Sequence, residues 1–257
     1  MAIDLREQAL RSLPELRFVS TQKRVRAALH GETVVDSCDA VLVWEPRRVV
    51  PQYAVPPRDL HLTLTEHRPA PLPERLGPVL EPYHPEWHTT PGTSLHADGV
   101  GEVAFRPDDP SLDGRLVVRF DRFVWREEDE LVVSHPHDPY ARIDVLRSDR
   151  HVRVEIDGTL VAESTHPVAL FETGLPVRWY LPREDVRTDL LTPSDTHTTC
   201  AYKGQASYLS AGDARDVAWF YPAPLNDAVP VQDLLCFWRS ATVYVDGAPV
   251  PTGMPGD

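Results

Sequence analysis

Short runs that alternate apolar and polar residues, separated by glycine, proline or aspartate, recur along most of the chain. Three of them, at residues 25–29, 33–37 and 40–45, follow one another with a glycine turn after the first. This pattern is typical of β-strands joined by tight turns. The N-terminus differs, since residues 5–11 have the composition of a short helix. We therefore expect a helical cap at residues 1–20, followed by an all-β fold.

The same order of runs returns in the second half of the chain. Residues 25–50 can be laid on residues 152–177 without a gap, and the shared positions include a turn glycine, a serine after a strand and a glutamate after an apolar run. The matched pairs are Val25/Val152, Arg26/Arg153, Gly31/Gly158, Val34/Val161, Ser37/Ser164, Val41/Val168, Glu45/Glu172 and Val50/Val177. We interpret them as two copies of one β unit, a duplication rather than a solenoid, which needs about three repeats or more.

The repeat predicts a mainly β chain built from two tandem small β domains. The first domain spans residues 21–147 and the second spans residues 148–250, with the boundary near Ser148. The last residues, 251–257, are expected to form a disordered tail, as chain ends often do.

The two copies differ most where polar residues gather. Downstream of its first strands, the first copy enters a segment rich in proline and histidine, and its apolar pattern resumes at residues 101–107, which parallel residues 216–222. Of the polar motifs of the second copy, the first copy has no PSD and no C-x-Y-K-G, and it has only a partial PRED at Pro57, Arg58 and Asp59. We expect either that the first copy kept its core and lost the site, or that it lends His84, His88 or His96 to the site of the second copy.

Charged and polar side chains are concentrated in residues 172–204 more densely than a regular helix or strand requires. The motif PRED at residues 182–185 begins with a proline, which turns the chain in a new direction. One interpretation is a capped turn in which Asp185 accepts backbone hydrogen bonds. The other is an anion-binding site in which Arg183 and Arg187 contact the ligand and neighbouring carboxylates tune them.

The segment LTPSDTHTTC, at residues 191–200, also has two interpretations. Its Ser-Asp pair after Pro193 is typical of a turn or a helix N-cap. Asp195, His197 and Cys200 are also the residue types of an acceptor, a base and a nucleophile, and a histidine beside a cysteine is a known route to a reactive thiolate. The trio lacks a further pair of ligands, so we expect no metal site.

The motif CAYKG ends this stretch. Lys203, immediately before Gly204, could bring its ammonium group and nearby backbone donors to an anion, or it could be an exposed turn lysine. The other glycines of a nucleotide-binding Walker loop are missing, which excludes that class of ATPase. Most aromatic residues nearby should be core, but Tyr202, Trp219 and Tyr221 are expected to line a pocket.

Composition excludes several other classes of protein. The chain has 257 residues, 42% of them hydrophobic and 25% charged, as in ordinary globular proteins. It has no apolar run of about 18 residues, no secretory leader and only three scattered cysteines, so we expect a cytoplasmic protein that does not bind membranes. The formal charge of −13 opposes nucleic-acid binding, which needs a cationic surface.

The blocks ETGLPVRWYLPREDVR, LLTPSDTHTTCAYKG and VAWFYPAPL resemble the signature of the domain-of-unknown-function family 427. The resemblance covers residues 150–246 and extends to residues 22–130 as a diverged copy. It implies coiled antiparallel sheets of a β-tent or barrel-like kind, and it carries no established reaction or cofactor. Some catalogues attach a nucleotidyltransferase label to this family, but the chain lacks the Gly-Ser and D-x-D carboxylates of such an enzyme.

Three hypotheses on function follow. The leading one is a module in the second copy that binds a small polar or anionic ligand. Its predicted contacts are Arg183, Arg187, Asp195, Tyr202, Lys203, Gly204, Trp219 and Tyr221. The second is an enzyme that uses Cys200, or the acidic pair Glu184 and Asp185, as nucleophile or general base. The third is a structural or protein-interaction domain whose motifs are only turn chemistry. The sequence leaves the cofactor and the oligomeric state unknown.

Overall fold

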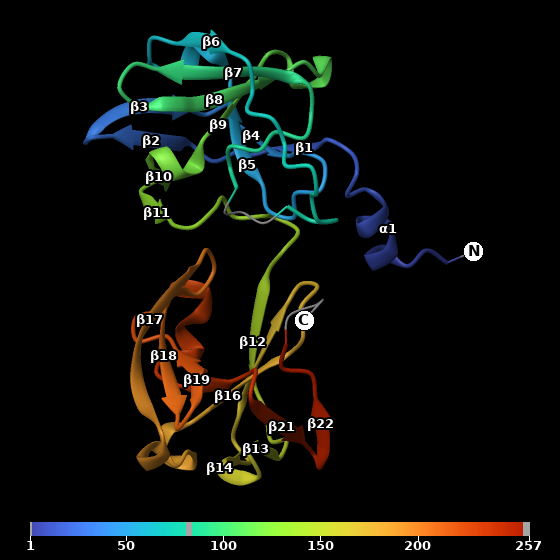
Figure 1. The fold of residues 1–257 in the computed structure, drawn as a ribbon, viewed down its shortest axis with the longest axis vertical. Helices are drawn as coiled ribbons and strands as arrows, with labels where there is room; N and C mark the ends of the chain where they lie inside the picture. The colour runs from blue at the N-terminus through green and yellow to red at the C-terminus, as the bar shows by residue number, and fades with distance from the viewer. Residues whose placement is uncertain (1, 81–83, 254–257) are drawn as a thin grey trace. The chain divides into compact units, whose positions relative to one another are not determined.

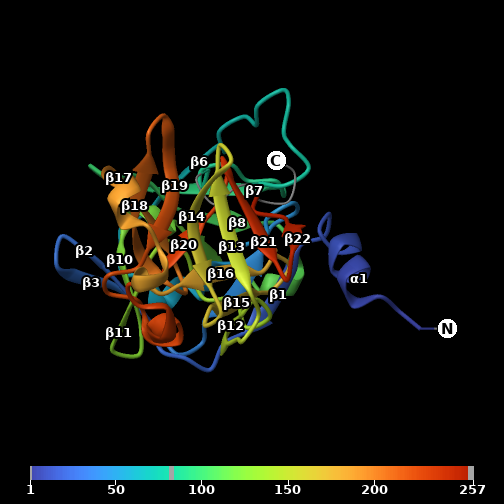
Figure 2. The same ribbon diagram turned by 90° about the horizontal axis from the view of Figure 1, so that it is seen from below.

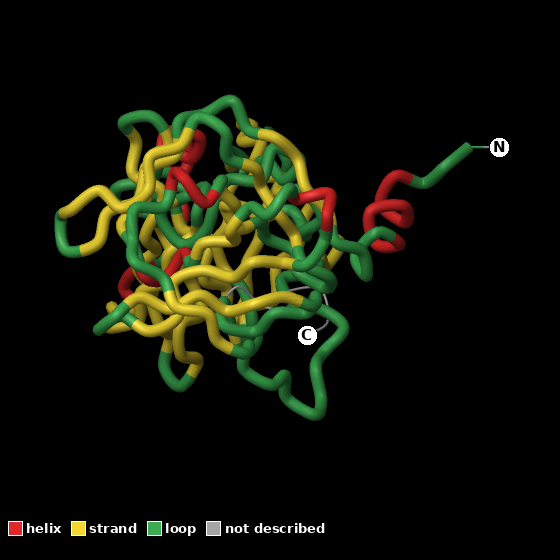
Figure 3. The backbone as a smooth tube through the Cα atoms, turned by 90° about the horizontal axis from the view of Figure 1, so that it is seen from above, coloured by secondary structure: helices red, strands yellow, loops and turns green. Residues whose placement is uncertain are grey.

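The computed structural model describes residues 2–80 and 84–253. The chain divides into two compact units, Met1–Asp138 and Pro139–Asp257, and its strands form four antiparallel sheets. The predicted mainly β fold is therefore confirmed, and strands and loops account for nearly all of the backbone in Figure 3. Within the described residues, no helix is both long and apolar enough to span a bilayer.

Helix α1 (Leu5–Arg11) has the bounds that the sequence predicts. The side chain of Asp4 accepts a hydrogen bond from the backbone N–H of Glu7, and Glu7 pairs with Arg11 one turn later. The helix does not cover the core of the first unit, because Leu5 and Leu10 are exposed. Figures 1 and 2 both show α1 apart from the sheets of that unit.

The first unit contains a seven-stranded and a four-stranded sheet. The large sheet has the order β1 (Arg17–Ser20), β4 (Val41–Trp44), β5 (Gln52–Val55), β9 (Leu116–Val118), β8 (Gly101–Pro107), β7 (Gly92–Ala97) and β6 (Thr65–His67). The small sheet has the order β11 (Glu130–Val132), β10 (Val124–Glu127), β2 (Val25–Leu29) and β3 (Glu32–Ser37). Side chains from both sheets share one hydrophobic core. Short 3₁₀ turns connect the strands at η1 (Pro57–Asp59), η2 (Pro110–Leu112) and η3 (Phe120–Arg122).

The second unit repeats this plan. Its large sheet has the order β12 (Ile143–Arg147), β15 (Val168–Glu172), β16 (Arg178–Leu181), β20 (Leu235–Phe237), β19 (Ala214–Phe220), β18 (Gly204–Ala211) and β17 (Thr192–Cys200). Its small sheet has the order β14 (Thr159–Ser164), β13 (Val152–Ile156), β21 (Ala241–Val245) and β22 (Ala248–Val250). The 3₁₀ turns are η4 (Arg183–Asp185), η5 (Thr188–Leu190) and η6 (Asn226–Val231).

The two units have the same strand order, position by position. Strand β4 pairs with β5 as β15 pairs with β16, so Val41 opposite Ala54 corresponds to Val168 opposite Tyr180. Even a register shift recurs, because β2 and β13 each carry one in their pairing with the following strand. The offset detected in the sequence thus corresponds to a shared topology.

The compact units meet ten residues or so before the boundary expected near Ser148. The reason is β12, which pairs with β15 as the edge strand of the second large sheet and so extends that unit toward the N-terminus. A second difference concerns residues 192–200, where the Ser194-Asp195 pair predicts a turn or N-cap. That prediction is wrong, since these residues form β17, an edge strand that tolerates Pro193 and bulges between Pro193 and His197. The tail beyond Gly253 lies outside the described residues.

The central strands β15, β16, β20 and β19 of the second large sheet carry buried residues on both faces, since successive residues of a strand go to different faces. On β19, Phe220 packs against the core that the two sheets share. Trp219, and Tyr221 just after the strand, pack on the opposite face, in a second cluster with Tyr180, Tyr208 and Cys236. This second face carries the polar residues considered below.

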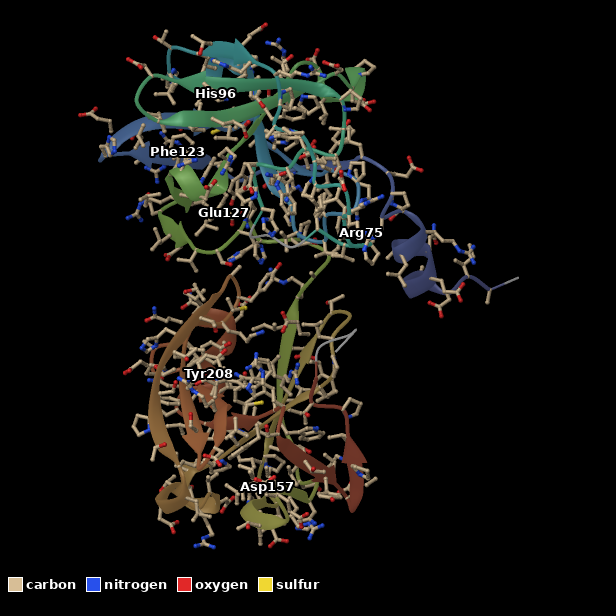
Figure 4. All side chains as sticks on the ribbon, in the orientation of Figure 1. Arg75, His96, Phe123, Glu127, Asp157 and Tyr208 are labelled. Carbon is tan, nitrogen blue, oxygen red and sulfur yellow. The ribbon has the colours of Figure 1, made fainter. Side chains whose placement is uncertain are left out.

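The two units differ most in the connection between the last two strands of the large sheet. In the second unit β17 and β18 are joined by the three-residue turn at residues 201–203. In the first unit β6 and β7 are joined by the long segment of residues 68–91. Figure 2 shows this segment projecting from the first unit in teal, and Figure 4 labels Arg75 on it.

Gly92, the first residue of β7, lies close against Phe105 and Arg106 of β8, and a substitution there tests this contact. A Cβ atom at Gly92 would lie 2.3 Å from the Phe105 ring and 2.4 Å from the carbonyl oxygen of Arg106. We expect Gly92→Ala to lower the free energy of unfolding by about 2 kcal/mol, because overpacking forces the backbone to shift. Chemical denaturation measures this change. The control is Ala206→Gly at the matching register position of β18, for which we expect a loss of only about 1 kcal/mol. An unchanged stability for Gly92→Ala would contradict the described contact.

Candidate functional site

The turn between β17 and β18 is buried, although hairpin turns usually lie on the surface. Ala201, Tyr202, Lys203 and Gly204 are all classed as buried, and only 8% of Lys203 is exposed. The loop that follows β19 covers this turn, because the backbone N–H of Leu225 donates to the carbonyl oxygen of Lys203 at 3.1 Å. Gly204 has a φ of +93°, a conformation that favours glycine and explains its place in the motif.

Lys203 forms an ion pair with a glutamate from a distant strand. Its Nζ lies 2.5 Å from Oε2 of Glu172, the last residue of β15. Strands β16, β20 and β19 lie between β15 and β18 in the sheet order, so the pair joins strands that are not neighbours. We call this glutamate–cation pair the clasp. Burial alone would lower the pKa of Lys203, but Cys200 and Glu172 raise it above its usual value, so the ammonium stays charged.

Cys200 belongs to the same cluster, but His197 does not. Cys200 ends β17 on the face that carries Thr198, whose hydroxyl lies 2.8 Å from the hydroxyl of Tyr208. Residues three apart on a strand point to opposite faces, so His197 points away from Cys200. Its Nδ1 instead lies 3.2 Å from the carbonyl oxygen of Ala206. The structure therefore gives Cys200 a lysine neighbour, not the histidine partner that a Cys–His dyad requires.

Aromatic side chains surround the clasp on this face of the sheet. The indole N–H of Trp219 donates to the Tyr180 hydroxyl at 3.1 Å, and the guanidinium of Arg178 lies over the Trp219 ring. Burial raises the pKa of Tyr180 and of Tyr221, so both phenols stay neutral and can donate hydrogen bonds. Figure 4 labels Tyr208, which lies on β18 in the same cluster.

The PRED motif lies elsewhere. It forms the 3₁₀ turn η4, whose N-cap is Pro182, and the backbone N–H of Asp185 donates to the carbonyl oxygen of Pro182 at 3.1 Å. The Arg183 guanidinium lies 4.5 Å from the centroid of the Phe220 ring, on the face opposite Trp219 and Tyr221. Arg183 and Glu184 are exposed and Asp185 is half-buried.

Two further predicted ligand contacts are also separate from the clasp. Arg187 is exposed and pairs with Asp189 at 3.2 Å. Asp195 is exposed in the bulged part of β17. The structure thus brings together Cys200, Tyr202, Lys203, Gly204, Trp219 and Tyr221, and it separates them from the arginines and Asp195.

Sequence reasoning missed Glu172 as a site residue, and it missed the matching residue of the first unit. Glu45 follows β4 as Glu172 ends β15, and its Oε2 lies 3.0 Å from Nδ1 of His88. The first unit therefore has a clasp of its own, with a histidine in place of the lysine. This position of the first unit thus carries a glutamate–histidine pair. The sequence did contain a signal for both glutamates, since Glu45 and Glu172 are matched positions of the repeat.

Within the part of the chain that the structure describes, no three His, Cys, Asp or Glu side chains are grouped to hold a metal ion. The polar groups of the clasp are instead an ammonium, a carboxylate, a thiol and phenols. Such groups can bind a polar ligand by hydrogen bonds and charge.

The structure is that of an all-β protein with two similar halves. The comparison with known families finds a match for the second half. Residues 144–248 match the model of the family described as Domain of unknown function (DUF427). The chain therefore contains one DUF427 domain, which includes the lysine clasp. The first half has a similar sheet arrangement but no family match. A comparison with curated proteins found no match.

The lysine clasp should stabilise the second unit measurably. Lys203→Met leaves the mostly buried carboxylate of Glu172 without its partner, and we expect it to cost about 3 kcal/mol of unfolding free energy. The double variant Lys203→Met/Glu172→Leu should lose clearly less than the sum of the two single variants, because the uncompensated charge is gone. Urea unfolding of the four proteins measures this cycle. Arg187→Met, which removes an exposed pair, serves as the control, and additive losses would refute the coupling.

Proposed function

We propose that the second half of the protein binds a small polar or anionic ligand at the Lys203 turn. The observation that carries this proposal is a charged lysine held in a nearly buried turn, with tyrosine and tryptophan side chains around it. Ligand sites of proteins commonly combine an aromatic lining with a few oriented polar groups. The DUF427 match adds no ligand, so the proposal depends on this arrangement alone.

Lys203 has hydrogen-bonding capacity left for a ligand. An ammonium group carries three N–H donors. Among the described residues, Glu172 accepts one of them and the Cys200 thiol lies close enough to interact with another. The third can meet an anionic oxygen, with Tyr202, Gly204, Trp219 and Tyr221 as the neighbouring contacts. Arg183, Arg187 and Asp195 lie outside this cluster and have no part in the proposed site.

We also infer that the first half is a diverged copy of the DUF427 domain. Its shared strand order, its matching clasp glutamate and the constant sequence offset support this inference. Ligand binding at the lysine turn would then belong to the second half, since the first half has no such turn.

The proposal can be tested with a thermal-shift screen of the full chain against phosphate, nucleotides, sugar phosphates and amino-acid derivatives. A probe at about 100 times its dissociation constant stabilises the folded state by roughly 2.7 kcal/mol, which raises the melting temperature by several degrees. We expect at least one anionic probe to raise the melting temperature of the wild type and to have no effect on Lys203→Gln.

Glu172→Gln is the matched variant for this screen. It breaks the same clasp but keeps the cation, so the shift caused by an anionic probe should persist. Loss of the shift in both variants would point to damage of the fold and not to a ligand contact. A panel without any shift would contradict ligand binding and favour a structural or protein-interaction domain.

The contact between Lys203 and Cys200 favours one alternative, an enzyme with a cysteine nucleophile. A neighbouring ammonium stabilises a thiolate, which is the reactive form. Glu184 and Asp185, the alternative acid–base pair, lie on η4 with the exposed PRED motif and share no contact with Cys200 in the described structure. Of the two enzymatic versions, the thiol version is thus the one that the arrangement supports.

Alkylation of the native protein distinguishes the three cysteines. Cys236 should resist alkylation until the protein unfolds, since burial raises its pKa to about 12 and only 1% of it is exposed. Exposed Cys38 should react like an ordinary thiol. If Cys200 is a nucleophile, it should react at least about tenfold faster than Cys38 at pH 7, and Lys203→Met should slow it. Peptide mass spectrometry measures the rates, and reaction slower than that of Cys38 would reject the enzymatic alternative.

A further inference from the structure

His88 of the first unit lies in the interior between two carboxylates. Its side chain is 1% exposed, and its ring stacks on Phe105 with the centroids 3.8 Å apart. Nδ1 lies 3.0 Å from Oε2 of Glu45, and Nε2 lies 3.2 Å from Oε1 of Glu102 on β8. The imidazole is therefore a bridge between the end of β4 and the start of β8.

This geometry requires a protonated ring. A neutral imidazole has one N–H donor and one acceptor nitrogen, whereas an imidazolium has two donors. Each ring nitrogen of His88 faces a carboxylate oxygen, and such oxygens only accept. With a neutral ring, one nitrogen lone pair would face a carboxylate in a site shielded from water.

Charged groups face His88 from several elements. They come from its own segment, from the loop after β4, from β8 and from the turn after β9, and they are Glu86, Glu45, Arg48, Glu102, Arg119 and Asp121. Only the carboxylates of Glu45 and Glu102 bond the ring itself. Glu86 and Asp121 are 39% and 42% exposed and pair with Arg119 on the solvent side.

We propose that His88 is a pH-sensitive switch: its protonated ring fastens residues 84–91 to β8, and this contact opens when the imidazole loses its proton. The bond to Glu102 is the one that should break. It is the longer of the two, and Ser94 and Arg119 remain as partners of Glu102. The bond to Glu45 should remain, with the single proton on Nδ1.

Most other anchors of this segment lie on the loop after β4, and the backbone N–H of Asp108, just after β8, donates to the carbonyl oxygen of Pro91 at 2.9 Å. Arg48 donates to the carbonyl oxygens of His84 and Trp87, and Thr89 donates to Glu45 and to the carbonyl oxygen of Pro46. Loss of the Glu102 bond thus loosens the segment on the β8 side without detaching it. The lysine clasp of the second unit has no such response near neutral pH, because the pKa of Lys203 is raised above that of an ordinary lysine.

The direction of the effect follows from the folded-state pKa of His88. Burial alone would lower this pKa, but the hydrogen bonds to Glu102 and Glu45 raise it above the usual value for histidine. A raised folded pKa means that the contribution to stability is complete below the unfolded pKa, near 6.5, and is lost as pH rises through the folded value. The segment should therefore be fastened at mildly acidic pH and loosened in alkaline solution.

Hydrogen–deuterium exchange of the full chain at pH 6 and pH 9, corrected for intrinsic exchange rates, tests the switch. We expect peptides covering residues 84–91 to lose protection about tenfold at pH 9, the factor for one buried hydrogen bond. Peptides around Lys203 should not change and serve as the internal control. His88→Gln, whose amide cannot titrate, should show equal protection at both pH values.

A second measurement on the wild type does not depend on the folding of a variant. Nitrogen-15 NMR of the His88 ring should show both nitrogens protonated at pH 7 and a single protonated Nδ1 at high pH. Equal protection of residues 84–91 at both pH values would overturn the proposal. So would an equal loss of protection in His88→Gln, or a neutral His88 ring at pH 6.

Discussion

A carboxylate that is removed from water must find a cation, and this requirement organises both halves of the protein. Glu45 and Glu172 occupy the same place at the end of the second strand of each large sheet. An unpaired charge there would cost several kcal/mol. Glu172 meets Lys203, which the chain brings back after β16, η4, η5 and β17, and Glu45 meets the nearby Arg48 as well as the returning His88. In each half this distant group lies just before the strand that pairs with an edge strand of the sheet. His88 precedes β7, which pairs with β6, and Lys203 precedes β18, which pairs with β17. The pair thereby joins strands that are not neighbours in the large sheet.

The two halves meet this requirement with different chemistry. Lysine is a compact charge with a raised pKa, and it leaves a donor for other groups. Histidine is flat, stacks on Phe105 and reaches a second carboxylate at the same time. The lysine half therefore combines stability with a potential contact for a ligand, whereas the histidine half uses all of its hydrogen-bonding capacity internally.

Much of the fold could be predicted from the sequence, because strand and turn patterns are local. Helix α1 has its expected bounds, and the runs at residues 25–29 and 152–156 are strands β2 and β13. The matched positions also predicted that both halves share one plan. Strand β17 could not be recognised, because Pro193 and a Ser-Asp pair are typical of turns and only the edge position makes them compatible with a sheet.

Only part of the candidate site could be predicted from the sequence, for a related reason. The cluster of Cys200, Tyr202 and Lys203 is contiguous in the sequence, so it could be predicted. Glu172 comes from another strand, 31 residues earlier in the chain, and its contact with Lys203 depends on the tertiary fold. The same holds for His88 and Glu45, which are 43 residues apart. Conversely, Arg183 is close to Lys203 in sequence but lies on the opposite face of the sheet, since the turn η4 packs beside β14 and not near the clasp.

The connection before β7 and β18 also has a practical meaning for protein engineering. One half closes it with the turn at residues 201–203, and the other accommodates residues 68–91 with the same strand order. The clasp and the strand pairing hold both ends of this connection, so its middle is free to vary in length. In the first half, this connection is therefore the natural position at which to graft a foreign peptide or a reporter segment.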